Sequence, residues 1–427
     1  MKSNRRKFLQ YTGMASLALL MDQTTWGKNL RNAIHDYQDT DPNLLAEEED
    51  FWHYVQQAYT ASSSIINLNN GGVSPSPIIV QEAMKRYHDM SNEAPTYYMW
   101  RQLDMGREPL RKRLAELAGV DSEEIALHRN ATESLETIIF GLKLKAGDEI
   151  ILSKYDYPNM INAWKQREER DGIKLVWVDP ELPSTDDTYL AQTYIDLMND
   201  RTKLVHITHI INWNGQILPV RMIADAAQAK GIEVLVDGAH SFAHFQYKIP
   251  DLNCHYFGTS LHKWLSASIG TGMMYVRKDK IASLYPLFGS EPASKNDIRK
   301  YEALGTRPFF IEQATQKAID FFEMIGAERK EKRLFYLKEY WTEQVRDIPG
   351  LNILSPTNPE HSCAIATISF TDKKPEELES FLMEQARIHT VGINWHRIQG
   401  VRITPNVYTS TKNLDRLVEA IHSFTKK

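Results

Sequence analysis

Short apolar runs alternate with amphipathic stretches through the middle of the chain, which predicts strands that alternate with helices. Apolar runs typical of buried strands lie at 124–127, 149–152, 174–178, 204–208 and 233–236. Apolar residues at helical spacing predict helices at 107–118, 132–141, 160–170 and 220–230. Helices of about ten residues between short strands are typical of a largely parallel sheet covered on both faces. The pattern therefore predicts an α/β domain.

The two flanking regions have different patterns. Before the alternating region, we expect a helix from near Pro42, a short strand at 65–70 that ends in Gly71 and Gly72, and a helix that runs through Tyr87. After it, long amphipathic helices are expected to pack on the main domain at 311–325 and 327–347. A smaller α+β unit follows, with strands at 365–370 and 401–404 and helices at 375–386 and 411–425.

These patterns divide the chain into four parts. We predict a signal segment over 1–24 and an N-terminal helical segment over 25–66 that packs on the small domain. A large domain over 67–300 and a small C-terminal domain over 301–427 complete the chain.

Composition narrows the range of functions. The 427 residues are 42% hydrophobic and 25% charged, as in soluble globular proteins of two or three domains. The net charge of −5, without a long Lys/Arg run, argues against nucleic acid and favours a small substrate. The two cysteines, Cys254 and Cys363, have no CxxC spacing, so neither a disulfide framework nor a metal site is expected.

Lys263 is the strongest candidate for a catalytic residue. It follows Ser260 and His262, and Asp237 ends the apolar run at 233–236. A lysine amine can form a Schiff base with pyridoxal 5′-phosphate (PLP), and a carboxylate can keep the pyridine nitrogen of PLP protonated. Most lysines are surface charges, and an acid after a strand is often a simple turn or cap residue. The combination of the two favours PLP as the cofactor.

A phosphate site is expected where a strand meets a helix at 129–134. The free backbone N–H groups near Ala131 and the Thr132 hydroxyl can hold an anion there, although a simple capping box explains the same residues. Ser260 and His262 are the other candidate phosphate ligands.

Two loop residues are candidates for the rest of the cofactor. Tyr157, in the aromatic segment 154–159, is expected to stack on the pyridine ring. Asn212, after the strand at 204–208, is expected to bond the phenolic oxygen of PLP or the substrate. Surface packing for the tyrosine and a turn role for the asparagine are the structural alternatives.

Together these segments resemble the class V aminotransferases of the fold-type I PLP enzymes, in particular the branch with isopenicillin N epimerase and the cysteine desulfurases. The resemblance runs from about Asn67 to the C-terminus. It is carried by Asn-Gly-Gly at 70–72, Arg-Asn-Ala-Thr-Glu at 129–133, Asp-Gly-Ala-His at 237–240, Ser-Leu-His-Lys-Trp at 260–264 and Val-Arg-Ile-Thr-Pro at 401–405. It implies a large domain with a mostly parallel seven-stranded sheet and a smaller α+β C-terminal domain.

The resemblance also implies roles for single residues. Lys263 would bind PLP, Asp237 would pair with the pyridine nitrogen, and His240 would lie near the phenolic oxygen. Ser260 and His262 would bind the phosphate.

Two further matches concern the substrate and the assembly. Arg402 matches the arginine that grips the substrate α-carboxylate, although by itself it would be read as a surface strand residue. Thr306, in the segment 305–308, matches a loop that relatives lend to the neighbouring subunit's phosphate site. The resemblance therefore implies a homodimer.

One departure from the family bears on the reaction. Desulfurases need a cysteine on a loop before the carboxylate arginine, and the segment 392–400 contains none. An aminotransferase is the first expectation, with an amino-acid epimerase or a C–S or β-elimination lyase as alternatives. A non-catalytic PLP-fold sensing protein is the remaining alternative, but 22–66 is too short and too acidic for a DNA-binding module.

The N-terminus predicts export. Arg5 and Arg6 precede Phe8 and Leu9, and a weakly apolar stretch follows at 11–21, which is typical of a twin-arginine signal. We therefore expect the Tat export machinery as a partner and a periplasmic location, with the signal either cleaved or kept as an anchor. A basic cytoplasmic helix is the alternative interpretation.

Overall fold

The computed structural model describes residues 24–291 and 294–426. The twin-arginine pattern lies outside the described residues, so export stays a prediction. Within the described part of the chain, no helix is long and apolar enough to cross a membrane.

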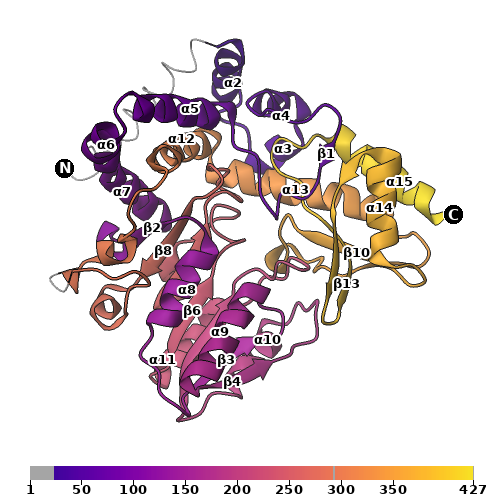
Figure 1. Ribbon diagram of the computed structural model, residues 1–427. Helices are drawn as coiled ribbons and strands as arrows, with labels where there is room; N and C mark the ends of the chain where they lie inside the picture. The colour runs from indigo at the N-terminus through magenta and orange to yellow at the C-terminus, as the bar shows by residue number, and fades with distance from the viewer. Residues whose placement is uncertain (1–23, 292–293, 427) are drawn as a thin grey trace.

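The centre of the molecule is one seven-stranded sheet (Figure 1). Its strands, in spatial order, are β2 (Ile125–His128), β8 (Gly272–Val276), β7 (Tyr256–Ser260), β6 (Glu233–Asp237), β5 (Thr202–Thr208), β3 (Glu149–Ser153) and β4 (Lys174–Val178). Strand β8 runs antiparallel to both of its neighbours, and all the other pairs are parallel. The predicted mostly parallel seven-stranded sheet is confirmed. The apolar pattern did not reveal β7 and β8, because β7 ends in the polar residues Thr259 and Ser260 although all of it is buried.

Helices cover both faces of this sheet. One face buries α8 (Ala131–Gly141) and α9 (Pro158–Asp171) against strand residues such as Ile150 and Leu235. The opposite face buries α10 (Asp187–Ile195) and α11 (Val220–Ala229) against Ile151 and Val234. Neighbouring strand residues thus enter opposite cores, as a pleated strand requires. Helix α10 was not among the predicted elements.

The N-terminal helices and the two long helices after residue 300 form a layer across the top of Figure 1. They are α2 (Thr25–Asp36), α3 (Pro42–Glu47), α4 (Glu49–Gln56), α5 (Ile78–Glu93), α7 (Arg107–Ala118), α12 (Phe309–Ile325) and α13 (Ala327–Val345). Helix α12 packs against α5 and α7, as expected for a helix on the main domain. Helix α13 instead packs on α3 and, through Leu337, Trp341 and Val345, joins the core of the C-terminal unit. The predicted domain borders stay predictions.

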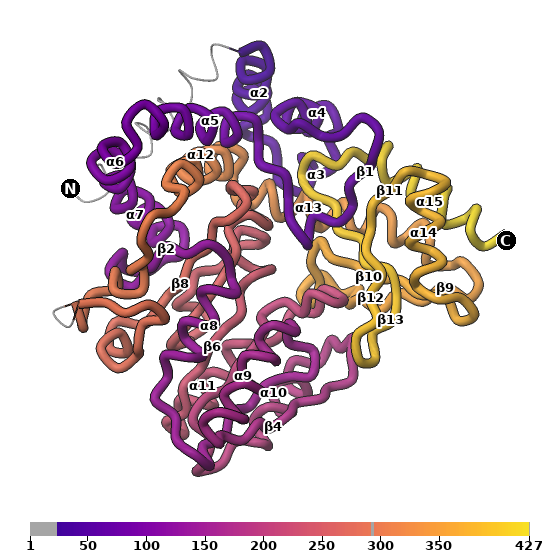
Figure 2. The backbone as a smooth tube through the Cα atoms, in the orientation of Figure 1, coloured from indigo at the N-terminus to yellow at the C-terminus, as the bar shows by residue number. Residues whose placement is uncertain are grey.

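The C-terminal unit is a four-stranded antiparallel sheet with two helices. Its strands lie in the order β12 (Val391–Trp395), β13 (Ile398–Ile403), β10 (Ala366–Phe370) and β9 (Leu351–Ile353), and its helices are α14 (Pro375–Ala386) and α15 (Thr411–Thr425). The segment 392–400, expected as a loop, is the β12–β13 hairpin, whose turn places His396 at φ +50°. Strand β1 (Ile66–Asn67) pairs in parallel with β11 (Ile388–His389), which ties the segment before α5 to the C-terminal unit (Figure 2).

Candidate active site

A cavity of about 680 Å³ lies where the ends of β5, β6 and β7 face the β12–β13 hairpin. Ligand sites of open α/β sheets form at the carboxyl ends of the strands in this way. The expected site residues that line it are Ala131, Thr132, Tyr157, Asn212, Asp237, His240, Ser260, His262, Lys263 and Arg402. Thr306 is the expected site residue that does not line it, because it is exposed on the loop before α12.

Lys263 stands in the turn that follows β7. Its Nζ lies 2.9 Å from Nε2 of His240. Burial lowers the pKa of Lys263 to about 8; the Asp237 carboxylate opposes this shift and the Arg402 charge adds to it. Burial also holds the pKa of His240 well below its usual range, so the amine faces a neutral imidazole. The cavity therefore holds an amine that loses its proton far more readily than an exposed lysine.

Asp237 is the last residue of β6 and points into the same cavity. Its Oδ1 accepts a hydrogen bond from the Ala239 N–H at 2.9 Å. Burial raises the pKa of the Asp237 carboxyl, while the Ala239 bond and the Lys263 charge oppose the shift. Only glycine fits at 238, because a Cβ there would come within 1.9 Å of the Phe257 ring. This close approach fixes the turn that aims the carboxylate.

The N-terminus of α8 forms another wall. The Asn130 side chain accepts from the Glu133 N–H at 2.9 Å, and the Ser260 hydroxyl accepts from the Ala131 N–H at 2.9 Å. Two of the backbone groups expected to be free for an anion therefore already have partners inside the protein. Thr132 and Ser260 still present their hydroxyls to the cavity. The phosphate roles of these residues stay predictions.

His262, the other expected phosphate ligand, is half-buried beside the turn of Lys263. Its Nδ1 lies 3.1 Å from the Thr271 carbonyl oxygen. Burial lowers the pKa of His262 to about 4, so the ring is neutral near pH 7. A neutral ring that donates Nδ1–H to this carbonyl leaves Nε2 as an acceptor for a protonated or hydroxyl-bearing partner.

Arg402 extends from β13 into the cavity, across from the large sheet. Its Nη1 donates to the Asn212 carbonyl and its Nη2 to Oδ1 of Asn69, each at 2.9 Å. Its Nε is buried without a hydrogen-bond partner, and no described carboxylate forms an ion pair with Arg402. Burial lowers the pKa of Arg402 to about 10, and the nearby Tyr157 phenol opposes the shift. A buried guanidinium held only by neutral oxygens is suited to binding an anion.

Asn69 is a site residue that the sequence did not reveal. Its amide oxygen orients Arg402, yet the two residues lie 333 positions apart. The one signal nearby was the Asn-Gly-Gly turn that begins at the next residue. Asn212 takes part through its backbone carbonyl, whereas a side-chain role was expected. Trp213, its neighbour, also lines the cavity.

Neither cysteine is available to the cavity. Cys254 and Cys363 are both buried, and burial raises the pKa of each thiol to about 12. A thiol that stays protonated near pH 7 is a poor nucleophile. Among the described residues, no group of His, Cys, Asp and Glu is arranged to hold a metal ion.

The residues present fit pyridoxal phosphate. The half-buried amine of Lys263 and the buried carboxylate of Asp237 share one cavity with the Thr132 and Ser260 hydroxyls at the N-terminus of α8, which suits the aldehyde, the pyridine nitrogen and the phosphate. The unpartnered Nδ1 of buried His240 and Nε of Arg402 are polar atoms that a ligand can satisfy.

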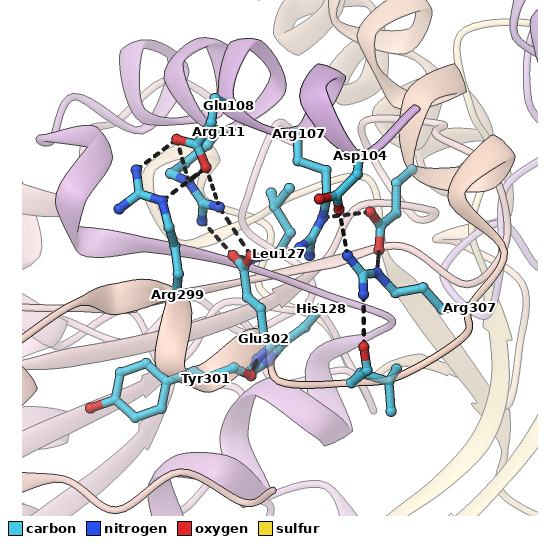
Figure 3. Close-up of polar contacts among 12 residues, drawn as sticks. Asp104, Arg107, Glu108, Arg111, Leu127, His128, Arg299, Tyr301, Glu302 and Arg307 are labelled. Carbon is cyan, nitrogen blue, oxygen red and sulfur yellow. Dashed lines mark hydrogen bonds and ion pairs between the residues drawn. The ribbon is translucent and has the colours of Figure 1, made fainter. Parts of the chain in front are cut away.

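A second group of buried charges, the Glu302 cluster, lies beside the edge strand β2, outside the cavity (Figure 3). It consists of Arg107, Arg111, Leu127, Glu302 and Glu312. The Glu302 carboxylate accepts from both arginines, with Arg107 at 3.0 Å, and from the Leu127 N–H at 2.6 Å. Burial alone would raise the pKa of Glu302, but the Arg111 hydrogen bonds and the two arginine charges outweigh it and lower the pKa.

The chain is similar to known proteins over most of its length. A family model described as "Aminotransferase class-V" matches residues 66–416. The chain is similar to isopenicillin N epimerase of Streptomyces clavuligerus, with 28% identity over 394 residues that cover 88% of this chain and 98% of that protein. It is similar to a cysteine desulfurase of Haloferax volcanii, with 24% identity over 387 residues that cover 84% and 89%.

Solved structures share the fold. The apo structure of a cysteine desulfurase from Thermococcus onnurineus NA1 superposes with a TM-score of 0.78 at 21% identity and covers 89% of this chain and 98% of that one. The cystine C–S lyase C-DES, in complex with its product cysteine persulfide, has a TM-score of 0.76 at 21% identity and covers 84% and 97%. The predicted fold-type I architecture is confirmed.

Proposed function

Because the chain belongs to the aminotransferase class-V family of PLP-dependent enzymes, we propose that Lys263 removes the Cα proton of a bound amino acid and that the outcome is transamination. The observation that carries the proposal is the half-buried Lys263 amine, which lies 2.9 Å from the neutral His240 and whose pKa is lowered to about 8. An amine with a pKa near the working pH is suited to be a general base. When bound, PLP supplies an electron sink that makes the proton removable.

The other residues bind and orient the reactants. Asp237 would hold the pyridine nitrogen protonated, since a buried carboxylate gains a partner there. The Ser260 and Thr132 hydroxyls, at the N-terminus of α8 where Ala131 begins the helix, would donate to the phosphate, and the Nε2 of His262 would accept from a protonated phosphate oxygen. Tyr157 would lie against the ring and Asn212 near its phenolic side. Arg402 would bind the α-carboxylate, which supplies the counter-charge that the guanidinium lacks.

The test begins with the visible spectrum of the purified protein. Bound PLP should give a band near about 410–430 nm that is absent from Lys263→Ala. In D₂O the wild-type enzyme should exchange the Cα hydrogen of its substrate, as followed by NMR. With a second keto acid supplied as the acceptor of the amino group, it should convert the amino acid into the corresponding keto acid. A protein without the band, or with a band unchanged in Lys263→Ala, would refute the proposal.

Epimerisation is the second candidate, and Tyr157 is the observation that favours it. In the sheet order, β7, which leads to Lys263, and β3, which leads to Tyr157, lie on opposite sides of β6 and β5. The Tyr157 phenol lies close enough to Arg402 to act on its pKa. A second acid on the wall opposite Lys263 would return the proton to the other face of Cα. Two of the similar proteins are isopenicillin N epimerases.

Product analysis separates these outcomes. Chiral chromatography should detect the mirror-image amino acid if epimerisation occurs, and Tyr157→Phe should then block inversion while Cα exchange from the Lys263 side continues. A keto acid without inversion supports transamination. Ammonia together with a fragment of the substrate would indicate an elimination lyase. Because the chain belongs to an enzyme family, we do not propose a non-catalytic sensing function.

Assembly and location are proposals of the same kind. We propose a homodimer in which the exposed Thr306 reaches the phosphate site of the neighbouring subunit, so Thr306→Ala should weaken PLP retention without changing the dimer mass in light scattering.

We also propose export by the twin-arginine route. Replacing Arg5 and Arg6 together by lysine should keep the protein in the cytoplasmic fraction, whereas export of this double variant would contradict the signal.

A further inference from the structure

The cavity has an apolar and aromatic wall that the cofactor roles do not use. The side chains of this wall are Val73, Trp213, Ile269, Val391 and Ile393. They come from four separate places in the chain: the turn after β1, the segment after β5, the loop before β8 and strand β12. Val73 and Ile269 are 42% and 68% exposed, so they lie where the cavity opens to solvent. A substrate entering the site must contact this wall.

Charges are scarce in the same cavity. Among the described residues that line it, the carboxylate is Asp237 and the cations of Lys and Arg type are Lys263 and Arg402. The pKa values of His240 and His262 are lowered by burial, so both rings are neutral near pH 7. In the proposed function Asp237 and Lys263 serve the cofactor. Arg402 then remains as the cation for the substrate, and among the described residues of this chain that line the cavity no second acid meets an amine on the substrate side chain.

Basic side chains do lie just outside the cavity, but they already have a carboxylate partner. Lys154, His396 and Arg397 surround the Asp179 carboxylate at 2.8, 2.8 and 2.9 Å. Lys154 and His396 line a separate groove on the far side of Trp395. This cluster therefore anchors the tip of the β12–β13 hairpin to the large sheet instead of offering a second anion site to the substrate.

Trp213 makes the wall rigid. Its indole N–H donates to the Tyr155 carbonyl at 2.9 Å, and its ring stacks on Trp395 with centroids 5.0 Å apart and planes 16° apart. Trp395 is held in turn by a 2.9 Å hydrogen bond to the Lys154 carbonyl. Two mutually stacked indoles, each fixed to a backbone carbonyl, keep one shape on binding. Such a wall selects by apolar contact and fit.

We infer that the substrate is an α-amino acid with one carboxylate, which Arg402 binds, and an uncharged, largely apolar side chain, which the wall of Val73, Trp213, Ile269, Val391 and Ile393 receives. The inference rests on the proposed function. A second carboxylate or an amine on the side chain would lose its hydration against this wall without gaining a partner. Discrimination of that kind should at least reach the lower end of the roughly 10- to 200-fold that a single methylene group provides.

The test uses the full-length PLP-bound enzyme and titrates amino acids while the visible spectrum reports binding. Leucine, norvaline and methionine should bind at least about tenfold more tightly than aspartate, glutamate, lysine and arginine. Equal or tighter binding of glutamate or lysine would overturn the inference and leave the proposed function standing. If no PLP band forms, or if no amino acid changes the band, the proposed function falls and the inference falls with it.

Two variants locate the selectivity in the wall. Ile269→Arg adds a cation at an exposed position, so glutamate affinity should rise about tenfold, whereas Ile269→Gln, the uncharged control, should leave it unchanged within about twofold. Trp213→Ala should weaken leucine binding about tenfold and alanine binding by less than about twofold. A single cooperative melting transition and a retained PLP band verify that each variant folds. Unaltered preferences in both variants would overturn the assignment of the side-chain site.

Discussion

Buried charge is handled in opposite ways in the Glu302 cluster and in the cofactor cavity. In the cluster, Glu302 accepts from both Arg107 and Arg111, and Glu312 accepts from Arg107 at 2.8 Å. In the cavity, Arg402 is held by neutral oxygens and Lys263 by a neutral imidazole. A buried arginine is thus paired with a carboxylate in the cluster and left without one in the cavity.

The difference separates structural charge from functional charge. A buried ion pair costs most when one partner is removed, because the other is left uncompensated. A buried cation without a counter-charge is already in that costly state, so a ligand that brings the missing charge stabilises it. The Glu302 cluster is therefore expected to respond to mutation mainly in stability, and the cavity mainly in binding and rate.

The largest expected effect is on catalysis at Lys263. Lys263→Ala should lower the rate of Cα hydrogen exchange by at least about 10²–10⁴-fold, since it removes the general base. Its melting temperature without PLP should stay at or above that of the wild-type protein, because a buried, poorly paired amine has been removed. NMR measures the rate of Cα hydrogen exchange, and calorimetry without PLP measures the melting temperature. A large loss of stability would contradict the contrast between the regions.

Breaking the Glu302 cluster should cost the most stability. Glu302→Gln leaves Arg107 and Arg111 without their shared carboxylate, and we expect a loss of about 3–5 kcal/mol in the free energy of unfolding. Urea denaturation measures the loss. The matched control is Arg221→Ala, which breaks the exposed Arg221–Asp225 pair and should cost less than about 1 kcal/mol. Equal losses in the two variants would mean that the cluster is not a structural unit.

Arg402→Gln should change substrate binding while sparing the fold. Loss of a charged hydrogen-bond donor to the α-carboxylate costs about 1.5–3 kcal/mol, which raises the dissociation constant roughly 10- to 150-fold. The free energy of unfolding without ligand should remain within about 1 kcal/mol of the wild-type value, because removing the guanidinium leaves no buried carboxylate without its counter-charge. Asn69→Ala, which frees one edge of Arg402, should weaken binding by a smaller factor. Spectral titration measures the dissociation constant, and urea denaturation measures the free energy of unfolding.

A further expected effect is a pH dependence of stability without PLP. The folded-state pKa of Lys263, lowered to about 8, lies below the ordinary lysine value of about 10.4. Between these values the unfolded chain binds more protons, so stability should rise with pH from about 8 to about 10.4. In Lys263→Ala the free energy of unfolding should increase less with pH, because the contribution of Lys263 is absent. The difference between the two proteins in urea midpoint at pH 8 and pH 9.5 isolates it from other titrating groups.

Features that depend on neighbouring residues in the chain could be predicted from the sequence, whereas features that depend on contacts between distant residues could not. Lys263, Asp237 and the helix boundaries of α7, α14 and α15 follow from short local patterns, and the structure has these helices at the expected residues. Strand β12 was missed because 392–400 carries glycines and polar residues that are half-exposed on a hairpin. Asn69 could not be recognised, because its role exists only through a contact with a residue 333 positions away.

The same contact constrains how the protein is made. Asn69 leaves the ribosome early, and Arg402, its partner across 333 residues, leaves near the end. At roughly 5–20 residues per second, the interval is on the order of 20 to 60 seconds. During that time the nascent chain can form its central sheet and hold Lys263, but the pocket for the substrate carboxylate cannot yet exist. Competence to bind PLP and competence to bind an amino acid should therefore arise at different moments in the synthesis of one chain.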